Sequence, residues 1–105
     1  MVYPFDRKES IAANVDHKID LWDYFGRVPV EYVRIKCTED FRIWMVYMSG
    51  TAMEYHEGGF ANIPLELTNY GLKAVIVRPT AAATIYTHAT TYAPEPPSVT
   101  AVKGG

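Results

Sequence analysis

Two stretches decide the fold class: Val30-Glu-Tyr-Val-Arg-Ile-Lys-Cys37 and, three residues later, Phe41-Arg-Ile-Trp-Met-Val-Tyr-Met48. In the first, apolar side chains alternate with polar ones at a period of two, which is typical of a half-buried β-strand. The second is apolar on both faces, which predicts a central strand or one covered on both sides. Because the connection Thr38-Glu-Asp40 is short and polar, we expect the two strands to pair as a hairpin.

Further strands are expected on both sides of this pair, separated by residues typical of turns. They cover residues 15–22, 51–55, 60–67, 72–77 and 85–92. Within 60–67, Pro64 cannot donate a ladder hydrogen bond, so this segment is either an edge strand or a loop. We expect a tight turn over 68–71, because Asn69 and Gly71 tolerate a positive φ.

The two ends of the chain show little strand character. Residues 7–14 predict one or two helical turns, with Asp6 as the N-cap and Glu9 in the position of a capping box. The alternative is an extended arm that docks on the sheet or on a neighbouring molecule. Three prolines after Ala93 predict an extended tail. The expected organisation is an N-terminal arm (1–14), a β domain (15–93) and a C-terminal tail (94–105).

Six or seven short strands at intervals of roughly ten residues predict an all-β fold, a small antiparallel β-sandwich or barrel. The chain of 105 residues is 49% apolar and 13% aromatic, which is enough for one domain with one core. Its single cysteine, Cys37, excludes an internal disulfide. Because Cys37 alternates with Val33 and Ile35, we expect it to be a buried apolar residue.

Charge and motifs argue against several classes of function. The formal charge of −2 gives no bulk electrostatic case for a nucleic-acid or membrane partner. No apolar run approaches the ~20 residues that span a bilayer, and we expect synthesis in a reducing cytosol. The histidines, His17, His56 and His88, lack the spacing of metal ligands, and no nucleophile motif or phosphate-binding loop is present. We therefore expect no enzymatic activity, no metal and no cofactor.

Five aromatic residues offer a binding alternative: Trp22, Tyr24, Tyr32, Trp44 and Tyr55. On an exposed face they would form a platform for a sugar or a single strand of nucleic acid. The alternative, which we favour, is that most of them pack in the core of so small a domain.

Residues 79–94 hold no Lys, Arg, Asp or Glu. An uncharged segment of this kind is either an interior strand covered on both sides or an edge strand that a partner chain covers. The arm and the Pro-rich tail favour the partner, since both are suited to contacts between molecules. The expected subunit contacts are Tyr3, Phe5, Thr84, Tyr86, Thr87, Pro94, Pro96 and Pro97.

Three stretches give the chain a family resemblance: Val-Tyr-Pro-Phe at 2–5, Leu-Thr-Asn-Tyr-Gly-Leu-Lys-Ala-Val-Ile-Val at 67–77, and the Thr/Ala-rich residues 80–93. In these the chain resembles the small β-sandwich structural proteins of tailed-phage virions, of the capsid decoration and head-completion kind. The resemblance implies a non-enzymatic virion protein, made in the host cytoplasm, that packs against copies of itself or against a shell. The alternative from another class is a carbohydrate- or ligand-binding β-sandwich module.

Overall fold

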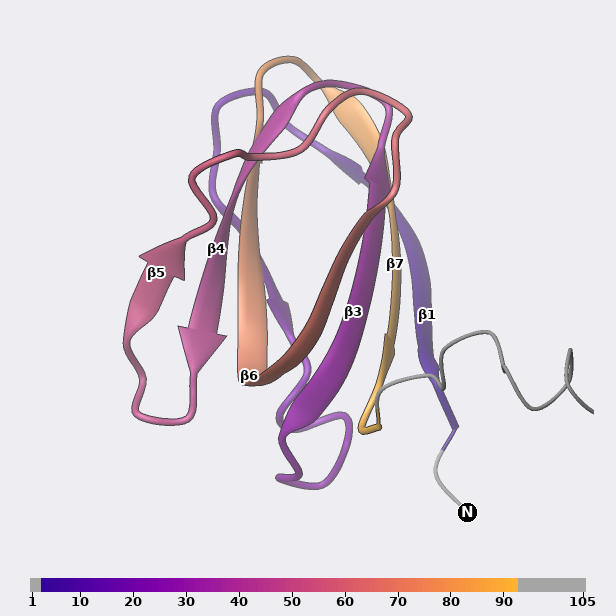
Figure 1. The fold of residues 1–105 in the computed structure, drawn as a ribbon. Coiled ribbons are helices and arrows are strands. Elements are labelled where there is room, and N and C mark those ends of the chain that lie inside the picture. Colours follow the sequence, from indigo (N-terminus) through magenta and orange to yellow (C-terminus); the bar gives the residue numbers. More distant parts are fainter. Residues whose placement is uncertain (1–2, 93–105) are drawn as a thin grey trace, which may run out of the picture.

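Residues 3–92 are described by the computed structural model, and every regular element among them is a β-strand (Figure 1). The strands are β1 (Phe5–Ile11), β2 (His17–Asp20), β3 (Val30–Cys37), β4 (Phe41–Tyr47), β5 (Ala52–Glu54), β6 (Leu65–Pro79) and β7 (Ala83–Thr90). All of their pairings are antiparallel. The predicted all-β antiparallel fold is confirmed. Within the same range, no helix is long and apolar enough to cross a membrane.

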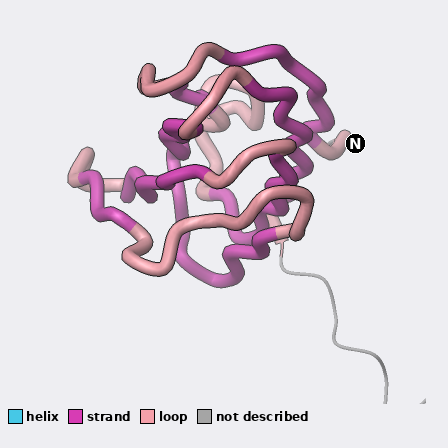
Figure 2. The backbone as a smooth tube through the Cα atoms, turned by 90° about the horizontal axis from the view of Figure 1, so that it is seen from above, coloured by secondary structure: helices cyan, strands magenta, loops and turns pink. Residues whose placement is uncertain are grey.

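One sheet, folded over on itself, makes two layers. Its strand order is β1-β7-β3-β6-β4-β5, and β2 pairs with β6. The first half of β6 pairs with β3, and the second half pairs with β4 and β2. Layer 1 therefore consists of β1, β7, β3 and the first half of β6, and layer 2 of β2, the second half of β6, β4 and β5 (Figure 1). Seen from above, strands and loops alone enclose the interior (Figure 2).

The bend in β6 joins the layers. Figure 1 shows β6 running down one layer, bending sharply and running up the other. Asn69 and Gly71 both have φ of 65° at this bend, and the Gly71 amide donates to Glu31 Oε1 at 3.0 Å. The expected tight turn over 68–71 is thus a bend inside one long strand. The expectation that Asn69 and Gly71 take a positive φ is confirmed.

The core lies between the two layers. Inward-facing side chains come from alternate positions, such as the fully buried Val33, Ile35 and Cys37 of β3, which share the core with Ile43 and Val75 of layer 2. The prediction that Cys37 is buried is confirmed. Burial raises the pKa of its thiol, because a thiolate is poorly solvated there.

The predicted hairpin between β3 and β4 is wrong. These strands lie in different layers, β3 between β6 and β7 and β4 between β6 and β5. The connecting residues explain the difference, because their polar groups bind other segments. Thr38 Oγ1 accepts from the Thr84 amide at 3.0 Å, and Asp40 Oδ1 accepts from the Ala61 amide at 2.8 Å. The connection crosses from one layer to the other instead of closing a turn between neighbouring strands.

The predicted helix at residues 7–14 is also wrong, because Phe5–Ile11 is strand β1. It pairs along its whole length with β7, from Phe5 opposite Ala89 to Ile11 opposite Ala83. Both end residues are buried, Phe5 to 2% exposed and Ile11 to 7%. Two apolar anchors and a full ladder stabilise the strand more than an isolated helical turn would be stabilised by its caps. The other expectation, an extended segment that docks on the chain's own sheet, agrees with β1.

The expectation that residues 79–94 form an edge strand covered by a partner chain is wrong for residues 79–92, the part that the structure describes. Strand β7 lies between β1 and β3 and pairs with both. The amides and carbonyls of β7 therefore find their hydrogen-bond partners within the chain. This agrees with the other expectation for this segment, an interior strand. The lack of charge follows from this position, since an interior strand needs no charged residues to prevent edge pairing.

A close contact ties the β5–β6 connection to β4. The Phe41 amide donates to the Gly59 carbonyl at 3.0 Å, and the Gly59 amide donates to the Phe41 carbonyl at 2.8 Å. A Cβ on Gly59 would lie 2.0 Å from the nearest atom of the Phe41 ring. Only glycine fits at this position, because the ring of Phe41 fills the space above its backbone.

Candidate functional site

Within the described residues, no cluster of side chains that could hold a metal ion forms. Between residues 3 and 92, no three His, Cys, Asp or Glu side chains lie close enough together to hold a metal ion. Two of the histidines pair with different carboxylates, His17 Nε2 with Glu9 Oε2 at 3.1 Å and His88 Nδ1 with Asp6 Oδ1 at 2.7 Å. The remaining candidates for function are the outer faces and free edges of the sheet.

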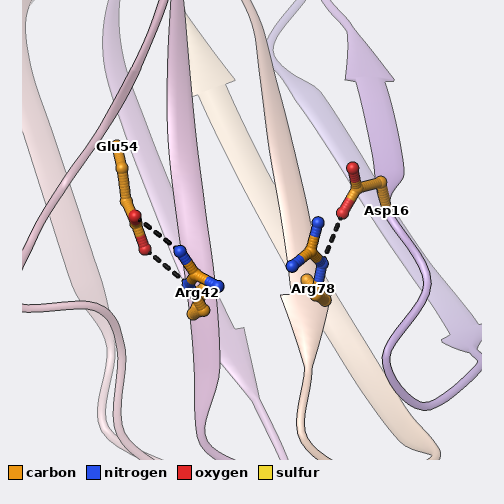
Figure 3. A network of polar contacts seen from close by, with 4 residues as sticks. All are labelled: Asp16, Arg42, Glu54 and Arg78. Carbon is orange, nitrogen blue, oxygen red and sulfur yellow. Dashed lines mark hydrogen bonds and ion pairs between the residues drawn. The ribbon is translucent and has the colours of Figure 1, made fainter.

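The outer face of layer 2 is a network of paired charges (Figure 3). Arg42 donates two hydrogen bonds to Glu54, at 2.6 and 2.7 Å, and Arg78 donates to Asp16 at 2.7 Å. Both guanidinium groups also lie over the Trp44 ring, each 4.9 Å from its centroid. Hydrogen bonds from the arginines lower the pKa of Glu54 and that of Asp16. Since its arginines and carboxylates satisfy one another, this face offers little charge to a ligand.

The outer face of layer 1 is arranged differently. The strand register puts Tyr86 of β7 opposite Lys8 of β1 on one side and Lys36 of β3 on the other. In the neighbouring row, His88 lies opposite Asp6 on one side and Arg34 on the other. Two basic side chains therefore flank one tyrosine, and a third lies in the next row.

These residues line a depression of about 600 Å³ that we call the basic concavity. Its lining consists of Asp6, Arg7, Lys8, Arg34, Lys36, Thr38, Asn62, Tyr86, Thr87 and His88. Four of these are Lys or Arg and one is Asp, so the formal charge of the lining is +3 with His88 neutral. Within residues 3–92, no ion pair involves Lys8, Arg34 or Lys36. Three of its four cations are thus unpaired within the described residues, while Arg7 pairs with Glu9 at 3.6 Å, on a chain whose net charge is −2.

Beside the concavity, the side chain of Tyr32 lies on the outer face of layer 1 and is buried there, 8% exposed. Its hydroxyl donates to Glu66 Oε2, and its ring meets the His88 ring edge-on with centroids 5.9 Å apart. Burial, together with the bond to Glu66, raises the pKa of Tyr32 to about 12. Tyr32 therefore remains a neutral donor to Glu66, which lies opposite Arg34 in the ladder between β3 and β6.

The second candidate is the side of the sandwich where β5 ends layer 2 and the first half of β6 ends layer 1, which we call the open side. Within the described residues, β5 pairs only with β4, and the first half of β6 pairs only with β3. Exposed apolar side chains lie on β5 and on the connection from β5 to β6. They are Met53, Phe60 and Ile63, which are 56%, 58% and 59% exposed.

The expected contact residues have different environments in the structure. Tyr3 is 69% exposed, and Tyr86, at 41% exposed, lies in the basic concavity. Thr84 is partly buried, and its amide donates to Thr38 Oγ1. Two of the expectations need correction: Phe5 packs against Tyr24 in the chain's own core, and Thr87 is on the buried side of β7, 3% exposed.

The other three expected contacts, Pro94, Pro96 and Pro97, lie outside the described residues. The five aromatic residues considered as a platform do not share one face. Tyr32 lies on the outer face of layer 1 and Trp44 on the outer face of layer 2. The guanidinium groups of Arg42 and Arg78 lie over the Trp44 ring, and Tyr55 packs against the core.

Sequence reasoning missed the basic concavity. The alternation of Arg34 and Lys36 in the sequence did mark one face of β3 as polar and basic. Lys8, however, lies in the segment expected to be helical, and Tyr86 in a strand expected at an edge. Comparisons with protein-family models, with curated proteins and with solved structures gave no significant match.

Proposed function

We propose that this chain is a non-enzymatic assembly protein whose copies associate through the open side. The observation that carries the proposal is the combination, on one side, of two unpaired strand edges with exposed apolar residues. An unpaired strand edge presents a row of amides and carbonyls that another chain can complete. Exposed apolar side chains beside it supply the surface that association buries.

The other two sheet edges support the choice of the open side. Within the described residues, β1 pairs only with β7 and β2 only with β6, so each has one free edge. Charged residues fill the middle of β1, Asp6 to Glu9, and alternate along β2 at Lys18 and Asp20. Charges along an edge are a common protection against pairing with another chain. The strands of the open side carry fewer charges, Glu54 on β5 and Glu66 on the first half of β6, and the exposed apolar Met53, Phe60 and Ile63 lie on β5 and on the connection that follows it.

A second copy of the chain is the simplest partner. Two identical strand edges pair antiparallel across a two-fold axis, which gives a closed, self-complementary interface. Copies arranged in this way extend layer 1 from one molecule to the next through the first half of β6. In the wider setting that the family resemblance implies, the assembly is a capsid decoration or head-completion component of a virion.

The test is the oligomeric state of the full chain by size-exclusion chromatography with light scattering over a range of concentrations. We expect an oligomer that Phe60→Asp or Ile63→Asp converts to the monomer of 11.8 kDa. The matched control is Val15→Asp, because Val15 is 56% exposed but lies next to β2, away from the open side. A chain that stays monomeric at every concentration contradicts the proposal, and so does a control variant that dissociates equally.

Hydrogen exchange tests the surface independently of the variants. In the assembled protein, we expect amides of residues 66–70 to be protected relative to the monomer. Exchange at the same rate in both states would move the interface away from the first half of β6 and overturn this part of the proposal.

A further inference from the structure

We propose that the basic concavity on layer 1 is a binding site for the phosphate groups and base of a nucleotide, either free or within a single-stranded nucleic acid. The site and the open side meet at the β5–β6 connection, where Asn62 of the concavity lies between Phe60 and Ile63. The inference is tested separately, because Lys8, Lys36 and Tyr86 have no part in the assembly proposal.

Cations of three neighbouring strands lie close together on the face of the concavity. Neighbouring strands lie about 4.8 Å apart, so the backbones at Lys8 and Lys36 are separated by about 10 Å, with Tyr86 between them. The two ammonium groups have no carboxylate partner within residues 3–92, and Arg34 adds a third unpaired cation beside them. Like charges on one face repel, and a bound anion relieves that repulsion. Phosphate is the dianionic or monoanionic group for which lysine and arginine side chains are the usual ligands.

A partly exposed aromatic ring lies between these cations. Tyr86 is 41% exposed, and the Lys8 ammonium lies 5.5 Å from its centroid. The flexible Lys8 side chain moves off the ring without steric hindrance, and the ring then offers a flat apolar surface on which a base stacks. An aromatic side chain on an open sheet face, flanked by cations that follow the backbone, is the usual platform for single strands. An acidic peptide would use the cations but has no group that needs the ring.

Uncharged polar residues also line the concavity. Asn62 and Thr38 contribute an amide and a hydroxyl to the lining, and such groups suit the edge of a base or a ribose. Asp6 is the one carboxylate in the lining, and it is paired with His88. A volume of about 600 Å³ lies within the range of small-ligand sites.

The net charge of −2 does not speak against this site. Electrostatic attraction depends on the local field, and exposed charges more than about 10 Å away are largely screened at ordinary ionic strength. The paired residues on layer 2 are on the opposite outer face, so their carboxylates contribute little to the potential over the concavity.

The test uses the full chain and a fluorescently labelled oligothymidylate of about twelve nucleotides, with anisotropy measured between about 50 and 200 mM salt. We expect binding that weakens with salt. Replacing both Lys8 and Lys36 by Ala should lower the slope of log K against log salt by about 0.7 for each phosphate that the variant no longer neutralises. The matched control is Lys18→Ala, because Lys18 is an exposed lysine on the outer face of layer 2, and it should leave the affinity unchanged.

The ring is tested by Tyr86→Ala and Tyr86→Phe. Loss of base stacking should weaken binding about 5- to 100-fold in the alanine variant, while phenylalanine should keep the affinity. A mononucleotide is then used to displace the labelled oligonucleotide. If it competes as well as unlabelled oligonucleotide at the same concentration of nucleotides, the ligand is a free nucleotide. If it competes much more weakly, the ligand is a single strand. Circular dichroism of each variant shows that its fold is intact.

Three results would overturn the inference. No binding at the lowest salt excludes an anion site for nucleotides. An equal loss of affinity in Lys18→Ala shows that binding is not at the concavity. Binding of polyglutamate as tight as that of the oligonucleotide, with Tyr86→Ala unaffected, assigns the face to acidic polypeptides instead.

Discussion

Replacing Gly59 by alanine tests the packing between β4 and the β5–β6 connection. The glycine backbone lies directly against the buried ring of Phe41, which is 3% exposed. A Cβ at position 59 would lie 2.0, 2.3 and 2.4 Å from three atoms of that ring. Carbon atoms in contact ordinarily lie about 3.5–4.0 Å apart, so the ring has to move by more than about 1 Å.

The magnitude follows from what that movement displaces. Phe41 packs in a close-packed core, where an added methyl group that forces such a shift costs about 1–3 kcal/mol. Complete expulsion of the ring sets an upper limit of about 3–5 kcal/mol, the cost of removing a buried phenylalanine. We expect Gly59→Ala to lower the free energy of unfolding by about 2–3 kcal/mol, because the ring shifts without leaving the core. For a domain of this size the melting temperature should fall by roughly 10–20 °C.

The assay is urea unfolding followed by tryptophan fluorescence, with a double-mutant cycle. Phe41→Leu removes the ring atoms that clash, so the double variant should be more stable than the sum of the single effects by about 1 kcal/mol or more. Gly50→Ala is the comparison for backbone strain without a clash, because Gly50 has φ of 91° and open space around it. A Gly59→Ala variant within about 0.5 kcal/mol of the parent, or additive effects in the cycle, would refute the packing argument.

Three further outcomes are expected. Glu54→Gln should make the free energy of unfolding, measured in urea, depend less on pH between about pH 6 and 3. Arg42 lowers the pKa of Glu54 in the folded state. The ion pair therefore stabilises the fold above the usual pKa of 4.5, and this stabilisation is lost as the pH falls through the lowered pKa. An unchanged pH dependence would show that the Arg42–Glu54 pair contributes nothing. Gly71→Ala should cost about 1–2 kcal/mol by the same assay, because φ is 65° there and a Cβ would meet only Glu31 Oε2, at 4.0 Å; a parental stability would contradict this. Cys37 should react slowly with a thiol reagent in the native protein and rapidly in urea, since burial raises the pKa of its thiol; rapid native reaction would show that β3 opens readily.

Strand positions were predictable because alternation is a local property of the chain. β3 occupies the residues expected for it, 30–37, and β4 ends one residue before the expected limit of 41–48. Pairing is not local, and the short connection at residues 38–40 gave a wrong partner. Its length allows a hairpin, but Thr38 and Asp40 form hydrogen bonds with distant segments that the sequence does not reveal.

The ends of the sheet were harder to predict than its centre. β1 lies at an edge, so the middle of the strand carries charges on both faces and only Phe5 and Ile11 mark it as buried. Two apolar residues six positions apart are too few for a periodic signal. The charged run instead indicates a solvated helical turn, which is the prediction that failed.

The candidate sites show the same division. Arg34 and Lys36 were recognised as the polar face of a strand, and Tyr86 as a residue available for contact. The concavity needs Lys8 as well, and only the pairing of β1 with β7 brings it beside Tyr86. A site assembled from three strands distant in sequence is visible only when their order in the sheet is known.

The position of β6 has a consequence for how the protein folds during synthesis. A chain that has emerged only as far as Pro64 contains β1 to β5, yet among these strands only β4 and β5 pair with each other. β2, β3 and β4 all require β6 as a neighbour, and β1 requires β7. Most of the sheet therefore forms only after residues 65–90 have left the ribosome. Until then Ile19, Val33 and Ile43 stay exposed, so a nascent chain paused before residue 65 is the form most dependent on chaperones.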